Sequence, residues 1–203
     1  MSVLPNANEK IAFYFDVGGV LMKDYLGPVF RSETFYRIAK VIPDLDPDRA
    51  EQIFVEMQND LDINHVTIAD LSRAIGVDHK KFTKEILDIH QFFPDRIQLI
   101  YDLASHGHKV GLASNFSSEW LLMLLQRITP LLAFDAICCS GLIGVAKPSQ
   151  SFFKKAQKMI GTDEVLFVDD RIVNTEAAFK FGWKIILAED DSWVNMIRRS
   201  YLA

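Results

Sequence analysis

The chain has 203 residues, 49% of them hydrophobic and 24% charged, with a formal net charge of -5 and a pI near 5.5. This length supports one sizeable core, or a core domain with a small insertion. The acidic balance argues against a nucleic-acid binder, because such a protein needs a basic surface to neutralise phosphates. A small phosphorylated ligand stays compatible with it, since a few placed cations can hold one.

The first predicted strand is the apolar run Ile11–Phe15, which ends at Asp16 just before Gly18 and Gly19. Such a run is typical of a strand buried inside a sheet. A carboxylate at its end is either a turn residue or the reactive group of a site. The rest of the chain has to decide between these two interpretations.

Residues 22–93 contain no strand-like run and read as helices throughout. Amphipathic periodicity predicts four helices, and Asp46, Thr67 and Asp78 are suitable N-caps for three of them. The predicted ranges are 33–41, 47–60, 67–75 and 78–89. We expect a small helical cap over one edge of the sheet, formed by residues 22–93, while residues 1–21 and 94–203 form the core.

After residue 94, short apolar runs alternate with helical segments. The predicted strands are 109–114, 134–139, 165–169 and 184–187, and the helices are 95–105, 117–128, 149–160 and 174–181. Glycine follows three of these helices, as expected of a helix C-terminus. This alternation predicts an α/β fold: an open, parallel, five-stranded Rossmann-like sheet with helices on both faces.

Two adjacent cysteines, Cys138 and Cys139, are the only ones in the chain, and neighbouring cysteines rarely bridge each other. We expect two core thiols in a protein of a reducing compartment, the cytoplasm. The first ten residues lack a secretory pattern, and the apolar stretch 120–125 is too short to cross a bilayer. No membrane partner is therefore expected, and nothing in the sequence specifies an oligomer.

Polar residues stand at the predicted carboxyl ends of three strands and in one loop. They are Asp16, Ser114 with Asn115, Asp169 with Asp170, and Lys147. Ligands of open parallel sheets bind at this edge. Each residue alone could be a turn or cap residue, but unrelated caps would not all fall on one edge with complementary charge.

Phosphoryl chemistry fits this set of side chains. Three carboxylates around one point repel one another unless a cation sits there, and hard oxygen ligands suit Mg²⁺. A lysine with serine and asparagine donors can hold the remaining oxygens of a phosphoryl group. Asp16 is then a candidate nucleophile for an aspartyl-phosphate step.

In these residues the chain resembles the haloacid dehalogenase (HAD) superfamily of hydrolases. Asp16–Leu21 resembles its first motif, Ala113–Asn115 the second, Lys147-Pro148 the third, and Phe167–Asp170 with Asn174 the fourth. The order and spacing of all four match, and the helical insertion resembles the family's small cap. The double glycine and the segment IGVAKP are similar to the epoxide-hydrolase N-terminal-domain and sugar-phosphate phosphatase branches.

The resemblance implies roles for these residues. Asp16 would be the nucleophile and a magnesium ligand, and Gly18 would supply a backbone carbonyl to the metal. Ser114 and Asn115 would hold phosphoryl oxygens, and Lys147 would stabilise both nucleophile and phosphate. Asp170, with Asp169 as a further ligand, would complete the metal site.

One position departs from the family pattern. Phosphatases of the family usually carry a second aspartate two residues after the nucleophile, as general acid and base, where this chain has Gly18. A positioned general acid contributes roughly 10²- to 10⁴-fold to rate. Leaving groups that need little protonation would tolerate its loss. Asp24 and Tyr25 lie just beyond the motif, but ordinary linker residues are the favoured interpretation of both.

Three functions are consistent with these observations. The leading one is a magnesium-dependent phosphomonoester hydrolase of a small metabolite. The second is a catalytically weak or silent relative that binds phosphate or a protein partner, supported by Gly18. The third is a metal-independent carbon–halogen hydrolase, against which the acidic pair Asp169-Asp170 speaks, because uncompensated carboxylates beside the nucleophile would be costly.

Overall fold

The computed structural model describes residues 10–128 and 134–202, and these contain one five-stranded parallel sheet in the order β3-β2-β1-β4-β5. The strands are β1 (Ala12–Phe15), β2 (Lys109–Ser114), β3 (Ala136–Cys139), β4 (Val165–Asp169) and β5 (Lys184–Leu187). The predicted α/β class and five parallel strands are confirmed. Relative to the predicted ranges, β1 begins one residue later and β3 begins two residues later.

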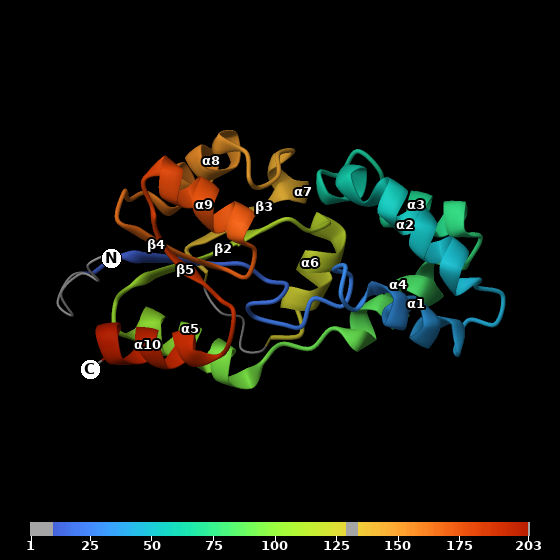
Figure 1. Cartoon of the computed structure of the whole chain (residues 1–203), viewed down its shortest axis with the longest axis horizontal. Coiled ribbons are helices and arrows are strands. Elements are labelled where there is room, and N and C mark those ends of the chain that lie inside the picture. The colour runs from blue at the N-terminus through green and yellow to red at the C-terminus, as the bar shows by residue number, and fades with distance from the viewer. Residues whose placement is uncertain (1–9, 129–133, 203) are drawn as a thin grey trace.

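Six helices accompany the sheet (Figure 1). They are α5 (Pro94–Ser105), α6 (Ser118–Leu125), α7 (Ser140–Ile143), α8 (Gln150–Ile160), α9 (Ile172–Phe181) and α10 (Ser192–Tyr201). In Figure 1, α8 and α9 cover the upper face of the sheet, and α5 and α10 cover the lower face. The central strands β1 and β4 are buried along their whole length, which explains their continuous apolar runs.

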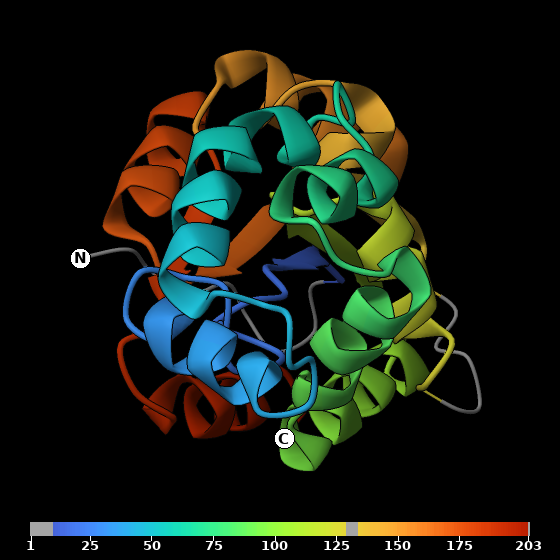
Figure 2. The same cartoon turned by 90° about the vertical axis from the view of Figure 1, so that its right-hand side faces the viewer.

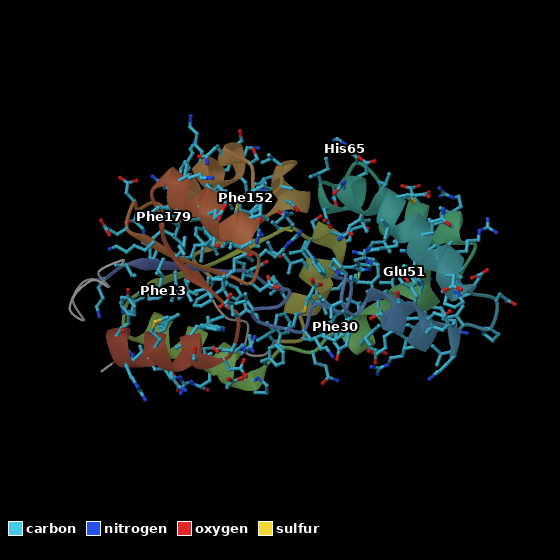
Figure 3. All side chains as sticks on the ribbon, in the orientation of Figure 1. Phe13, Phe30, Glu51, His65, Phe152 and Phe179 are labelled. Carbon is cyan, nitrogen blue, oxygen red and sulfur yellow. The ribbon has the colours of Figure 1, made fainter. Side chains whose placement is uncertain are left out.

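The side chains of the sheet divide the core into two layers. Phe13 of β1 packs below the sheet against His108 and Tyr201, whereas Phe152 of α8 belongs to the cluster on the opposite face (Figure 3). The sequence analysis missed α7 and α10. A local signal for α10 exists, because its buried residues recur at helical spacing: Trp193, Val194, Ile197 and Tyr201.

Four further helices lie beyond the carboxyl ends of the strands, on the right of Figure 1, and Figure 2 looks directly onto them. They are α1 (Arg31–Ala39), α2 (Pro47–Asp62), α3 (Ile68–Ile75) and α4 (His79–Ile89). The predicted N-caps Asp46, Thr67 and Asp78 each accept a backbone hydrogen bond in the first turn. The division of the chain into a core and a cap at these residues stays a prediction.

Hydrogen bonds fix the C-terminal end of α2 and the residues just after it against the core. The Ser140 hydroxyl on α7 donates to the carbonyl of Asp62 at the end of α2 and accepts from the Phe116 amide at 3.0 Å. The Asn64 amide donates to Ser118 Oγ at 2.8 Å. These contacts hold the C-terminal end of α2 close to the loop that follows β2.

None of the helices within residues 10–128 and 134–202 is long and apolar enough to span a bilayer.

Ser140 tests how much this connection contributes to stability. Ser140→Ala should lower the free energy of unfolding by about 1 to 3 kcal/mol, because it leaves a buried amide and a carbonyl unpaired. Urea denaturation measures this change. Ser105→Ala, which removes an exposed hydroxyl, should change the value by no more than about 0.5 kcal/mol. Equal effects of the two substitutions would contradict a stabilising role for Ser140.

Candidate active site

The predicted site residues converge at the carboxyl ends of β1, β2 and β4, which are adjacent strands. Six of the seven line one cavity between the sheet edge and α2: Asp16, Gly18, Ser114, Asn115, Lys147 and Asp170. The seventh, Asp169, is fully buried and contacts Lys147. The sequence therefore identified a set of side chains that the fold does bring together.

Lys147 lies at the cavity, and its side chain is completely buried. Its ammonium donates to Asp169 Oδ2 at 2.6 Å and to the Ala113 carbonyl at 2.7 Å, and it lies 3.1 Å from Asp16 Oδ2. These three partners use all three donors of the group. Burial lowers its pKa, but the two carboxylates outweigh burial and leave the pKa raised, so Lys147 stays charged.

Asp169 is held by four hydrogen bonds. Its Oδ2 accepts from Lys147 and from the Asn174 amide, and its Oδ1 accepts from the same Asn174 amide and from the Arg171 backbone N–H. A carboxylate offers about four lone-pair sites, so none is left over here. This geometry favours Asp169 as the anchor of Lys147 over Asp169 as a metal ligand.

Asp16 and Asp170 are the carboxylates that face the cavity. Asp16 Oδ1 accepts from the Val17 amide at 2.7 Å, which fixes the rotamer of the carboxylate. Gly19, with φ of +76°, lets Asp170 approach, because a Cβ there would lie 2.2 Å from Asp170 Oδ2. Burial raises the pKa of Asp16 to about 7 and that of Asp170 to about 6, and neighbouring carboxylates add to both shifts.

The donor set fits a hard divalent cation. One oxygen from each of Asp16, Asp169 and Asp170 lies within 4.8 Å of the others. Burial, and after it the neighbouring carboxylates, raise the pKa values of Asp16 and Asp170, and a bound cation would stabilise their ionised forms. Oxygen ligands at this spacing suit Mg²⁺. Because the lone pairs of Asp169 are already occupied by hydrogen bonds, Asp16 and Asp170 are the favoured direct ligands.

Ser114 and Asn115 differ in how many of their hydrogen-bond donors remain available to a ligand. The Ser114 hydroxyl is buried and has no hydrogen-bond partner within the described residues, so it can donate to a bound anion. The Asn115 amide instead forms two hydrogen bonds with the backbone of Lys147, at 2.7 and 2.8 Å. Asn115 thereby positions the backbone of Lys147, in the loop between α7 and α8, and keeps one N–H available to a ligand.

The cavity also contains residues that the sequence analysis did not assign to the site. Asp24 and Asp62 line it, and Arg171 lies at its border. Burial raises the pKa of Asp62 to about 7, with a further contribution from Asp24. Asp62 carries no motif, and only the packing of α2 against the core brings it here. The favoured interpretation of Asp24 as a linker residue did not place it inside the cavity.

Comparison with known proteins agrees with this geometry. The family model for haloacid dehalogenase-like hydrolases matches residues 12–182. Drimenol cyclase drtB of Aspergillus calidoustus is 31% identical over 106 residues, which cover 51% of this chain and 20% of that protein. The chain therefore matches only about a fifth of the length of this relative.

Solved structures of low sequence identity share the fold. A HAD family enzyme of Bacteroides thetaiotaomicron has a TM-score of 0.72 at 21% identity, covering 93% of this chain and 98% of that one. The same enzyme in complex with magnesium and inorganic phosphate has a TM-score of 0.70 at 20% identity, covering 92% and 99%. L-2-haloacid dehalogenase of Xanthobacter autotrophicus has a TM-score of 0.61 at 19% identity, covering 87% and 76%.

The raised pKa values of Asp16 and Asp170 predict that Mg²⁺ binding depends on pH. Without metal, Asp16 and Asp170 hold protons more tightly in the folded state than in the unfolded one, so stability falls as the pH rises from about 4 towards 7. Mg²⁺ needs the ionised carboxylates, so protons compete with it. Calorimetry should show tight Mg²⁺ binding above about pH 7 and weak binding below about pH 6.

Asp170→Asn should abolish this binding, whereas Asp44→Asn, at an exposed loop position, should retain it. Binding that is equally strong in Asp170→Asn would show that Asp170 is not a ligand.

Proposed function

Since the chain belongs to the haloacid dehalogenase-like hydrolase family, we propose that it is a magnesium-dependent hydrolase of a small phosphorylated metabolite. Asp16 is its nucleophile, and the reaction passes through an aspartyl-phosphate. The proposal includes a cytoplasmic location, which the two buried free thiols of Cys138 and Cys139 support.

The charge balance of the site carries this proposal. The ammonium of Lys147 contacts Asp16 and Asp169, and a carboxylate oxygen of Asp170 lies within 4.8 Å of both, so that three carboxylates and one ammonium leave two negative charges at the end of the sheet. A phosphoryl dianion would be repelled by this site unless a divalent cation accompanied it. The magnesium and phosphate bound by the structurally similar Bacteroides enzyme support the same pairing of ligands.

In the first step, formation of the aspartyl-phosphate, each of these residues has a separate role. Asp16 attacks phosphorus with one carboxylate oxygen, the bond from phosphorus to the leaving oxygen breaks, and the leaving oxygen needs a proton. Lys147 and the Ser114 hydroxyl stabilise charge on the phosphoryl oxygens. Bound magnesium would polarise the phosphoryl group and screen it from the carboxylates. Water then attacks the aspartyl-phosphate, which releases phosphate and regenerates Asp16.

The site also explains why we favour phosphate over a halogenated acid. The dehalogenase of Xanthobacter autotrophicus, with chloropropionic acid covalently bound, shares the fold and is the alternative within the family. Carbon–halogen hydrolysis requires no cation, so the half-buried carboxylate of Asp170 beside Asp16 would then be an uncompensated cost. A phosphatase has a use for that carboxylate as a metal ligand.

A catalytically silent relative is the second candidate, because Gly18 stands where a general acid is expected. Such a protein would bind Mg²⁺ and phosphate at the same site without turnover. Turnover measurements therefore separate it from the leading proposal.

The direct test is phosphate release from a panel of phosphomonoesters, with Mg²⁺ and with EDTA. Wild type should release phosphate only with Mg²⁺, and Asp16→Asn should reduce release to background because the amide is a poor nucleophile. The melting temperature of the variant should show that it is folded. Asp60→Asn, an exposed substitution on α2, should retain activity.

Full activity in a folded Asp16→Asn variant would rule out Asp16 as the nucleophile. Metal and phosphate binding without release from any substrate would favour the silent relative. Halide release without metal would favour the dehalogenase.

A further inference from the structure

We infer that Asp24 is the general acid of this site, in the space that Gly18 leaves open. The inference rests on the proposed phosphatase function, and it assigns the proton donor that the first motif lacks. Its basis is the path of the chain after Gly19, which turns back and brings the carboxylate of Asp24 against the first motif.

The geometry at Gly18 is the first observation. A Cβ built on Gly18 would lie 3.4 Å from the Asp24 carboxylate carbon and 3.4 Å from its Oδ1, which is ordinary contact. The φ of Gly18 lies outside the left-handed region, so the backbone does not require glycine. Any side chain at position 18 would therefore contact the Asp24 carboxylate. The two residues share one space, and Asp24 fills it.

The close approach of Gly27 is the second observation, because it shows that the loop accommodates the Asp24 carboxylate in this position. The Gly27 amide donates to the backbone carbonyl of Asp24 at 3.2 Å, and a Cβ on Gly27 would lie only 2.0 Å from Asp24 Oδ2. No side chain fits there while Asp24 keeps its place. The loop Asp24–Gly27 is thus built around the carboxylate, which an ordinary linker residue would not require.

The surroundings of Asp24 suit a proton donor. It lines the same cavity as Asp16, and burial raises the pKa of its carboxyl, which favours the protonated form. Charged and titratable groups from four elements or loops interact with it. His90, Arg171 and Arg31 lower its pKa, and its own negative charge raises the pKa values of Asp62 and Asp170. Neither Asp169 nor Lys147 contacts it, so it is free of their buried ion cluster.

The proton transfers balance in both steps. As Asp16 attacks phosphorus, the Asp24 carboxyl gives its proton to the leaving oxygen, and the product alcohol departs. The resulting Asp24 carboxylate then takes a proton from the water that attacks the aspartyl-phosphate. Phosphate leaves, Asp16 is regenerated, and Asp24 is again protonated.

Asp62 is the competing donor, because it lies in the same cavity and its pKa is raised to about 7. It projects from the end of α2 in the cap, however, and no contact places it at Gly18. The position of Asp24 against the first motif favours Asp24.

The test measures kcat/KM against the acidity of the leaving group, because this parameter reports the step in which the leaving oxygen departs. Asp24→Asn should lower kcat/KM roughly 10²- to 10⁴-fold for alkyl phosphates. Aryl phosphates, whose leaving groups need little protonation, should lose less than about tenfold. Asparagine keeps the shape of the side chain, and calorimetry should show unchanged binding of Mg²⁺ with inorganic phosphate.

A second pair of variants tests the shared space. Asp24→Ala should lose alkyl-phosphate activity, and the double variant Gly18→Asp with Asp24→Ala should recover at least about tenfold, because its new carboxylate enters the vacated space. Gly27→Ala should behave like Asp24→Asn, since its Cβ displaces the carboxylate. A residue needed only for folding would not be rescued from position 18.

The outcomes separate this inference from the proposed function. The role of Asp24 would be overturned if Asp24→Asn lost activity equally for all leaving groups or lost none. It would also be overturned if Asp62→Asn, and not Asp24→Asn, showed the leaving-group-dependent loss. Each of these results would leave the proposed phosphatase function intact. Absence of phosphate release from the wild type with Mg²⁺ would overturn both.

Discussion

The buried contact between Lys147 and two aspartates is the constraint on which the site depends. An ammonium without solvent exposure is stable only if its donors are paired, and here Asp169, Asp16 and a backbone carbonyl pair all three. Asp169 is in turn saturated by Asn174 and a backbone amide. The lysine therefore has one possible position, and it fixes the position of the Asp16 carboxylate.

The same constraint explains the remaining electrostatics. Lys147 is shared between two carboxylates, so it cannot neutralise Asp16 fully, and Asp170 has no cation of its own in the described chain. Burial and, to a lesser extent, the neighbouring negative charges raise the pKa values of Asp16 and Asp170, and the residual negative charge favours a divalent cation at this edge of the sheet. Glycine at position 19 is needed because Asp170 comes so close to the first motif. Fold, charge and metal preference are therefore linked through one lysine.

Helix α2 and the loop that follows Gly19 complete the cavity from the other side. Gly18 removes a side chain from the first motif, and the carboxylate of Asp24 stands beside the space so created. The end of α2 brings Asp62 to the same cavity through the hydrogen bond of Ser140 with the Asp62 carbonyl. An acidic function lost at one position of a motif can thus be supplied from a residue outside the motif, provided that the chain returns to the same place.

The sequence by itself determined the α/β class, the five strands and the convergence of the motif residues, because apolar runs, helix caps and strand ends are local signals. It could also have revealed α10, whose buried residues recur at helical spacing. Only the tertiary structure distinguished Asp169 from Asp170, turned the Asn115 amide towards the backbone of Lys147 and brought Asp24 to Gly18. These features depend on which lone pairs are already occupied and on where a loop returns, and both follow from contacts between residues distant in the chain.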